Sequence, residues 1–317
     1  MTKRLLLIAL LAAAPASAQS TGPAAVPRFA VEGGQTFFTL QEAVREIGEG
    51  RGTIRIAPGR YEECITQDGG EIAYVADQPG GVIFDTVTCE GKAAFVLRGR
   101  AATIDGLVFQ NMQVPDRNGA GIRIEQGSLT VRESLFRNSE SGILGSNDQR
   151  GAIRIERSTF SGLGRCDDEY DCAHSIYING GGPVTVTVTN SRFERGRGGH
   201  YVKIRSPQVE VTDSSFDDSA GTATNYMIDL PWGANGTIAG NIFVQGRDKE
   251  NYSAFIALAG EGDENGPSRL NVVNNQASLV PGLQRRTVFL ADWSGSPVRL
   301  EVNRLGDQIS PTERRRR

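Results

Sequence analysis

Two sets of side chains capable of acid–base chemistry recur along the chain at intervals of 26 residues. The first set is Tyr177, Lys203, Asp229 and Phe255, and the second is His174, His200, Tyr226 and Tyr252. Apolar residues precede the first set at the same spacing, namely Ile176, Val202 and Ile228. Because alternate residues of a strand face opposite ways, an inward-facing Val202 implies an outward-facing Lys203. The spacing therefore predicts an outer ladder of Tyr177, Lys203 and Asp229.

The chemistry that this ladder predicts is proton transfer beside a bound anion. Arg205 follows Lys203 by two residues, so both are expected on the outer face, roughly 6.6 Å apart along the strand. The surrounding segment is basic, because Glu194 is its one acidic residue against Arg192, Arg195, Arg197, Lys203 and Arg205. A local charge of +4 in an acidic chain favours an anionic ligand.

Plainer interpretations compete with these hypotheses. Lys203 and Asp229 could form a simple ion pair between neighbouring coils, which contributes less than about 1 kcal/mol when exposed. His174, His200 and Tyr226 share the sequence parity of the inward-facing residues, so they could form a hydrogen-bonded stack at a corner. Trp232 lies three residues after Asp229 and could either stack on a sugar ring or pack against the protein.

The elements that position these residues are short strands separated by Gly, Asn and Ser turns. A fixed period between about 20 and 50 residues marks a solenoid, in which each unit packs on its neighbours. The recurring strands predict an all-β fold, a single-stranded parallel β-helix, with coils about 4.8 Å apart. A phenylalanine series predicts an internal aromatic stack: Phe109, Phe136, Phe160, Phe193, Phe216 and Phe243.

The chain divides into four segments. Residues 1–18 have a basic start, an apolar run and Ala16-Ser17-Ala18, which predicts a cleaved signal peptide. Residues 19–36 are rich in Pro, Ala and Gly and are expected to be a loose leader. Thr39 and Glu42 form a capping box that predicts a short helix over 40–48, covering the first coil. The β-helix is expected over 37–305, and a disordered basic tail over 306–317.

The four cysteines favour disulfides in an oxidising compartment. Cys64 and Cys89 lie 25 residues apart, about one coil, while Cys166 and Cys172 enclose a short loop. We expect these two bridges, although four cysteines allow three connectivities. The acidic residues within that loop could instead ligate calcium, or could be an ordinary acidic surface loop: Asp167, Asp168, Glu169 and Asp171. The CxxC spacing of zinc sites is absent, so no metal centre and no other cofactor are predicted.

Composition narrows the range of partners. The formal net charge is −3, and removal of residues 1–18, with Lys3 and Arg4, makes it −5. A chain this acidic argues against broad nucleic-acid binding, which requires an extended basic face. After the signal segment, no apolar run is long enough for a membrane span. We expect a periplasmic or extracellular protein of undetermined oligomeric state.

Two groups of motifs resemble a known family. Thr39-Leu-Gln-Glu-Ala43, Ile54-Arg-Ile-Ala-Pro-Gly-Arg-Tyr61 and the recurring Gly-Ile-x-Ile runs resemble the pectin-lyase-like right-handed parallel β-helix superfamily. Gly199-His-Tyr-Val-Lys-Ile-Arg-Ser206 and Tyr226-Met-Ile-Asp-Leu-Pro-Trp-Gly233 are similar to a group of exported bacterial β-helix proteins. The resemblance covers roughly residues 38–280. It implies a right-handed β-helix and a function connected with polysaccharides, either as an enzyme or as a non-catalytic adhesin.

Two subfamily patterns can be compared with the chain. Galacturonan hydrolases carry an Asp-Asp pair before Gly-His-Gly, whereas here Gly199-His200 precedes Asp217-Asp218, so the order is reversed. Alginate and chondroitin lyases use a lysine base and an arginine on neighbouring coils. Lys203 and Arg205 are loosely similar, but both lie on one coil. The closer similarity is therefore to a lyase that cleaves an acidic, uronate-containing glycan.

β-Elimination from a uronate requires a base, an acid and a group that neutralises the carboxylate. We expect catalytic residues among Lys203, Arg205, His200, Tyr177 and Tyr226. The expected substrate-binding residues are Asp229, Trp232, His174 and Arg197. The expected partner is an acidic polysaccharide, and the alternative is a non-catalytic glycan-binding or cell-envelope protein.

Overall fold

The protein is a solenoid of three parallel sheets, described by a computed structural model at residues 26–146, 150–166, 172–180 and 184–316. In spatial order, sheet A contains β2 (Thr36–Phe37), β1 (Phe29–Val31), β3 (Arg51–Ile56), β6 (Glu71–Ala76), β9 (Ala101–Asp105), β12 (Ser128–Arg132), β15 (Ile153–Glu156), β18 (Thr185–Thr189), β21 (Gln208–Thr212), β24 (Asn235–Ala239), β27 (Arg269–Val273) and β30 (Arg299–Glu301). Sheet B contains β4 (Gly59–Tyr61), β7 (Val82–Asp85), β10 (Leu107–Gln110), β13 (Leu135–Arg137), β16 (Thr159–Ser161), β19 (Arg192–Glu194), β22 (Ser215–Asp217), β25 (Ile242–Gln245), β28 (Gln276–Leu279) and β31 (Arg304–Leu305). Sheet C contains β5 (Ile65–Gln67), β8 (Ala93–Leu97), β11 (Ala120–Ile124), β14 (Ser141–Gly145), β17 (Ile176–Ile178), β20 (Val202–Ile204), β23 (Ile228–Leu230), β26 (Ala254–Leu258), β29 (Thr287–Asp292) and β32 (Ile309–Arg314).

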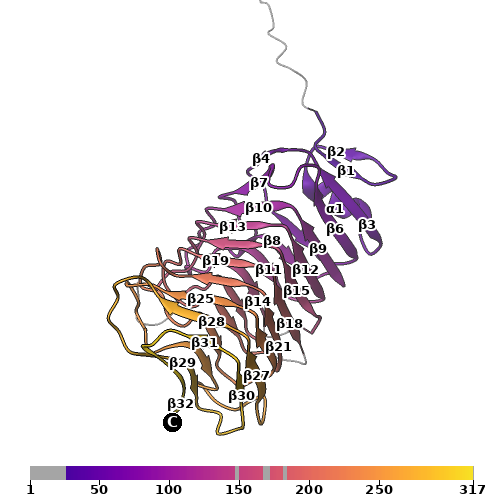
Figure 1. Cartoon of the computed structure of the whole chain (residues 1–317). Coiled ribbons are helices and arrows are strands. Elements are labelled where there is room, and N and C mark those ends of the chain that lie inside the picture. The colour runs from indigo at the N-terminus through magenta and orange to yellow at the C-terminus, as the bar shows by residue number, and fades with distance from the viewer. Residues whose placement is uncertain (1–25, 147–149, 167–171, 181–183, 317) are drawn as a thin grey trace, which may run out of the picture.

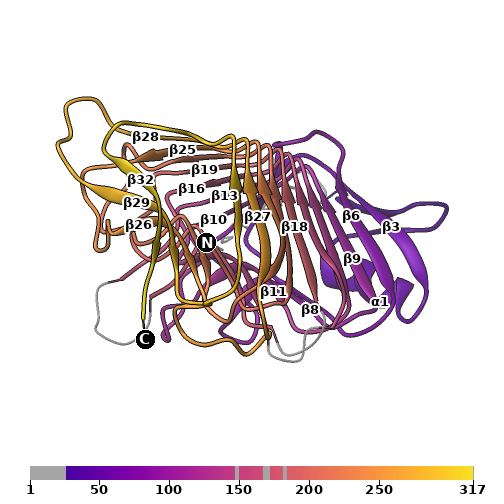
Figure 2. The same cartoon turned by 60° about the horizontal axis from the view of Figure 1, so that its bottom comes forward.

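Each full coil contributes one strand to each sheet, so the fold is the predicted parallel β-helix. The strands stack along one axis with α1 (Leu40–Ile47) at one end and the C-terminus at the other (Figure 1). Figure 2 views the same stack from another side, where strands of sheet A lie side by side from β3 to β27. Consecutive coils pair in parallel, and only β1 pairs antiparallel, with β2 and β3, among the described strand pairs.

The core follows from strand alternation. Along β18 the burial alternates, with Val186 and Val188 buried between more exposed threonines. The predicted phenylalanine stack is confirmed, because rings of consecutive coils lie 4.7–5.1 Å apart and nearly parallel from Phe109 to Phe243. Each coil thus buries its apolar side against the next, so the stability of a coil depends on its immediate neighbours.

The predicted cap helix is confirmed. Thr39 caps the helix by accepting from the Glu42 backbone, and the Glu42 side chain accepts from the Thr39 backbone. Leu40, Ala43 and Val44 form the buried face of this helix. The expected signal peptide lies outside the described residues. The expected loose leader is partly wrong, because β1 and β2 extend sheet A before the helix.

The expected disordered tail is also wrong. The strand β32 pairs in parallel with β29 and closes the last coil of sheet C. Its side chains are almost all exposed, which explains why its composition suggested disorder. Backbone hydrogen bonds to the sheet edge do not require apolar side chains, so a polar segment can form the final strand.

Both expected disulfides are present. Cys64 and Cys89 precede the paired strands β5 and β8, with their Cα atoms 5.4 Å apart, so this bridge staples neighbouring coils. Cys166 and Cys172 are also joined, with a Cα separation of 4.4 Å. The acidic residues predicted as a calcium-site alternative lie between them, outside the described residues. The bridges are compatible with an oxidising compartment outside the cytoplasm.

Candidate functional site on the outer face of sheet C

The predicted ladder exists on the outer face of sheet C. Tyr177 pairs with Lys203 and Lys203 pairs with Asp229, from β17 to β20 to β23. Val202 and Ile204, on either side of Lys203, are completely buried in the core. The inward and outward assignments of β20 are therefore confirmed.

The fourth members of both sets were placed wrongly. Ile228 pairs with Ile256, which is a step of 28 residues, so Ala257 follows Asp229 in the ladder. Phe255 is buried in the core, whereas Tyr252 is half exposed and lies under the guanidinium of Arg285. One additional residue in the turn between β23 and β24, and another between β25 and β26, shift the register by two residues.

Lys203 joins two carboxylates. Its Nζ lies 2.7 Å from Oε1 of Glu261 and 3.4 Å from Oδ2 of Asp229. Glu261 comes from the loop after β26, and its backbone N–H donates to the carbonyl of Pro231. The side chain of Lys203 is 11% exposed, so the ion pair is partly buried rather than an exposed surface contact.

Arg205 extends the cluster beyond β20. Its Nε donates to Oε2 of Glu261 at 3.1 Å, and its Nη1 donates to Tyr177 Oη and to Asn179 Oδ1. The guanidinium also lies over the ring of Tyr177 and over that of Trp232, 5.2 Å from the Trp232 centroid. Trp232 therefore belongs to the site, where it packs on a cation.

The second set forms a stack that faces outward beside the ladder. His174 and His200 stack with ring centroids 4.9 Å apart, and Tyr226 stacks on His200 at 5.6 Å. His200 Nε2 lies 3.4 Å from Oδ2 of the outward-facing Asp229. The backbone bends just before β17 and β20, so the inward parity of the strand does not extend to the histidines.

Burial governs the protonation of this cluster. Burial raises the pKa of Asp229 to about 6; the charge of Glu261 adds to the rise, and the charge of Lys203 opposes it. Burial also works against the charged form of Glu261, but hydrogen bonds from Lys203 and Arg205 outweigh it and lower its pKa. The two carboxylates on either side of Lys203 thus differ in acidity, which is the arrangement that separates an acid from a base.

The histidines are held neutral. Burial, with the charges of Lys203 and Arg205, lowers the pKa of His174 to about 3. Burial likewise lowers the pKa of His200 well below its ordinary value. Nδ1 of His174 accepts from the backbone N–H of His200 at 3.0 Å, which requires that nitrogen to be unprotonated. Burial raises the pKa of the Tyr177 hydroxyl.

One predicted site residue lies elsewhere. Arg197 is exposed in the turn between β19 and β20, and its Nη2 donates to the carbonyl of Ser139 at 3.4 Å. The basic residues behind the predicted local charge of +4 therefore lie on two surfaces, since Arg192 pairs with Glu194 on sheet B while Lys203 and Arg205 lie by sheet C. Tyr226 joins the stack, but its hydroxyl lies 3.5 Å from Ser253 Oγ.

The sequence pattern missed Glu261, Asn179 and Asn265. Asn265 donates from its amide to the carbonyl oxygens of Arg205 and Gly233, which ties the loop of Glu261 to the coil below. The sequence showed only that Glu261 lies in the coil after that of Asp229. Side chains in a loop do not alternate as they do in a strand, so the direction of the Glu261 side chain could not be predicted.

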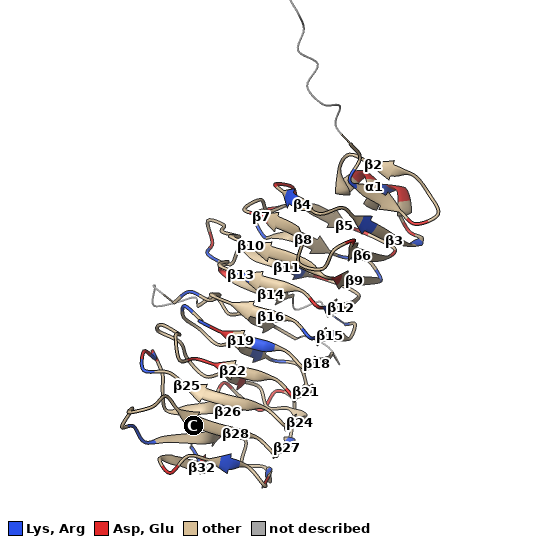
Figure 3. Ribbon diagram, turned by 45° about the horizontal axis from the view of Figure 1, so that its top comes forward, with Lys and Arg blue, Asp and Glu red and all other residues tan. Residues whose placement is uncertain are grey.

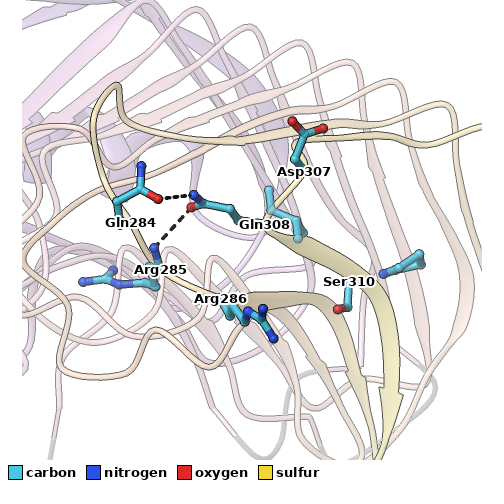
Figure 4. Close-up of a pocket in the computed structure, with 8 residues that line it drawn as sticks. Gln284, Arg285, Arg286, Asp307, Gln308 and Ser310 are labelled. Carbon is cyan, nitrogen blue, oxygen red and sulfur yellow. Dashed lines mark hydrogen bonds between the residues drawn. The ribbon is translucent and has the colours of Figure 1, made fainter.

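The depression near the C-terminal end does not contain the residues of the Lys203 cluster. A depression of about 690 Å³ lies near the C-terminal end, where Gln308 bonds to Gln284 and to the backbone of Arg285 (Figure 4). Acidic and basic segments are interspersed along the coils (Figure 3). Among the described residues, no cluster of three metal-ligating side chains occurs, and no helix has the length and hydrophobicity needed to cross a membrane.

Comparisons with known proteins give one family. A search of curated proteins finds no significant match. Among solved structures, a chain from Geobacillus virus E2, described as ORF18, is similar with a TM-score of 0.46 and 14% identity, over 87% of this chain and 58% of that one. The chain thus spans less than two thirds of that structure's length. A family model described as "Right handed beta helix region" matches residues 120–281, about half of the chain. The chain belongs to the right-handed β-helix family, which supports a carbohydrate-active or cell-envelope protein in general terms.

Proposed function

We propose that the outer face of sheet C binds an acidic glycan and that the protein cleaves it by β-elimination. One observation carries the proposal: Lys203 and Arg205 hold the same carboxylate, that of Glu261, from neighbouring outward positions. Charge-assisted bonds to a carboxylate from a lysine and an arginine are the contacts that a uronate sugar requires.

In this proposal, the carboxylate of the substrate takes the place of Glu261. The side chain of Glu261 is 41% exposed, against 11% for Lys203 and 17% for Arg205, so it covers the two cations from the solvent side. Exchange of one carboxylate for another leaves the charge balance of the site unchanged. The cost of uncovering buried cations is thereby avoided.

The reaction assigns one role to each group. Lys203 first passes a proton to Asp229, whose Oδ2 lies 3.4 Å from its Nζ, and the resulting neutral amine removes the proton from the carbon next to the sugar carboxylate, while Arg205 pairs with that carboxylate and stabilises the charge that develops there. The electron pair forms a carbon–carbon double bond, and the bond to the neighbouring glycosidic oxygen breaks. Asp229, whose pKa is raised to about 6, donates a proton to that leaving oxygen. His200, 3.4 Å from Asp229, orients this carboxyl group.

The test is an assay of the purified protein on a panel of uronate polymers, with ultraviolet absorbance of unsaturated sugar ends as the readout. We expect absorbance to rise with at least one polymer and to be abolished in Lys203→Ala. Arg154→Ala, an exposed arginine on the outer face of sheet A, is the matched control and should retain activity. Activity that survives in folded Lys203→Ala would exclude Lys203 as the base.

A second candidate function is non-catalytic binding of an acidic glycan at the same face. It is favoured by the pairing of both Lys203 and Arg205 with carboxylates, because these contacts suit the binding of an anion and leave the Lys203 Nζ engaged on both sides. Binding without new absorbance, weakened in Arg205→Ala, would select this function. Neither binding nor cleavage across the panel would reject both.

A further inference from the structure

Two adjoining depressions lie away from the Lys203 cluster, by the turns that follow the strands of sheet B. Their volumes are about 640 and 380 Å³, and Arg197 lines both. Arg137 and Arg195 line the first, and Arg165 lines the second. We call the two depressions together the arginine groove, defined by Arg137, Arg165, Arg195 and Arg197.

The groove is basic although the chain is acidic. Its described lining residues include four arginines and two glutamates, which gives +2, against −3 for the whole chain. Both glutamates are already engaged. Glu140 accepts from Arg165 and from two backbone N–H groups, and Glu194 pairs with Arg192 and accepts from Ser161. The remaining positive charge therefore faces the depression.

Arg195 and Arg197 are the exposed cations of the groove. Arg197 makes one long bond to a carbonyl, and the side chain of Arg195 has no ion pair or hydrogen bond within the described residues. Arg195 has a φ of 56°, and the equivalent positions of the three preceding coils hold Asn111, Asn138 and Gly162, all with positive φ. Asparagine and glycine adopt this conformation more readily than arginine.

The spacing and the lining fit a polymer. Arg137 belongs to β13 and Arg195 follows β19, two coils apart, which is about 10 Å along the solenoid axis. Between them, the lining offers the hydroxyl groups of Thr159 and Ser161 and the amide of Asn138. No aromatic residue lines either depression, so a platform for stacking nucleobases is missing from the described lining.

We propose that the arginine groove is a binding site for an acidic polysaccharide, which it holds through carboxylate or sulfate groups. An extended chain along the groove meets Arg137, Arg195 and Arg197 in turn and donates and accepts hydrogen bonds with the polar lining. The site is separate from the sheet C cluster, and it does not depend on the proposed elimination.

The experiment measures binding by calorimetry in the Lys203→Ala background, so that failure of the sheet C site is distinguished from failure of the groove. The probes are polygalacturonate, dextran sulfate, neutral dextran and a single-stranded DNA oligonucleotide; the first two separate carboxylate from sulfate recognition. The groove variants are Arg195→Asn and Arg197→Ala, with Arg154→Ala as control. Asn138 already occupies the position equivalent to Arg195, so Arg195→Asn is expected to melt no lower than its parent.

We expect the parent to bind at least one anionic glycan and not neutral dextran. Each groove variant should bind at least about tenfold more weakly, the effect of one charge-assisted hydrogen bond, while the control binds unchanged. Unchanged binding in both groove variants would overturn the proposal, as would absence of glycan binding by the parent. DNA binding as tight as glycan binding, lost in the same variants, would reassign the groove to nucleic acid.

Discussion

The neutral histidine stack makes the stability of the protein depend on pH. His174 and His200 are buried against each other, and they face the cations of Lys203 and Arg205, the carboxyl of Asp229 and the ring of Tyr226. Neither imidazole can take up a proton near neutral pH while the protein is folded. In the unfolded chain, both are expected to titrate near about 6.5.

The sign and the size follow from this difference. Below about pH 6.5 the unfolded chain binds two protons that the folded protein excludes, so the free energy of unfolding falls as the pH falls, by about 1.4 kcal/mol per pH unit for each histidine. Asp229 acts in the opposite direction. Its pKa is about 6 in the folded protein and about 3.9 when unfolded, so between these values acidification recovers about 1.4 kcal/mol per unit. The net loss between about pH 6 and pH 4 is therefore about 1.4 kcal/mol per unit.

Urea unfolding followed by circular dichroism at several pH values measures this dependence. The comparison is between the wild type and His174→Gln, because titrating groups that do not contact His174 cancel in the difference. The wild type should lose about 1.4 kcal/mol per pH unit relative to this variant below about pH 6. Arg154→Ala is the control and should run parallel to the wild type. If His174→Gln also ran parallel to the wild type, the neutral state of His174 would be refuted.

Three further predictions concern stability. Asp218 and Lys249 form a fully buried ion pair at 3.1 Å, so Asp218→Asn should cost about 3–5 kcal/mol in denaturant unfolding, and a loss below about 1 kcal/mol would mean that the charges are not buried together. Removal of the Cys64–Cys89 bridge by Cys64→Ser should lower the free energy of unfolding by about 3.5 kcal/mol by the loop-entropy estimate. Peptide mapping of the wild type without reduction should recover Cys64 and Cys89 in linked peptides, and free thiols at both positions would contradict the bridge. Val202→Ala should cost about 1–3 kcal/mol from the cavity it leaves, with uronate cleavage retained; unchanged stability would place Val202 outside the core.

The sequence by itself determined the architecture. Strand alternation and a coil repeat are local properties, so the spacing alone assigns Val202 and Lys203 to opposite faces of their strand. The cap helix after Thr39 is equally local, since a capping box needs four residues. The separation of 25 residues, about one coil, favoured the Cys64–Cys89 bridge, although four cysteines left three connectivities open until the structure showed this one.

Only the tertiary structure decided which charges meet. Glu261 reaches Lys203 through a loop whose path no period describes, and Arg197 points to a different surface from Lys203 although six residues separate them. The bend before β20 turned His200 outward against the parity of its strand. A sequence repeat predicts the path of the backbone, because equivalent positions of consecutive coils pair in the sheets. Turns and loops follow no such register, so the pairing of their side chains is fixed by packing in three dimensions.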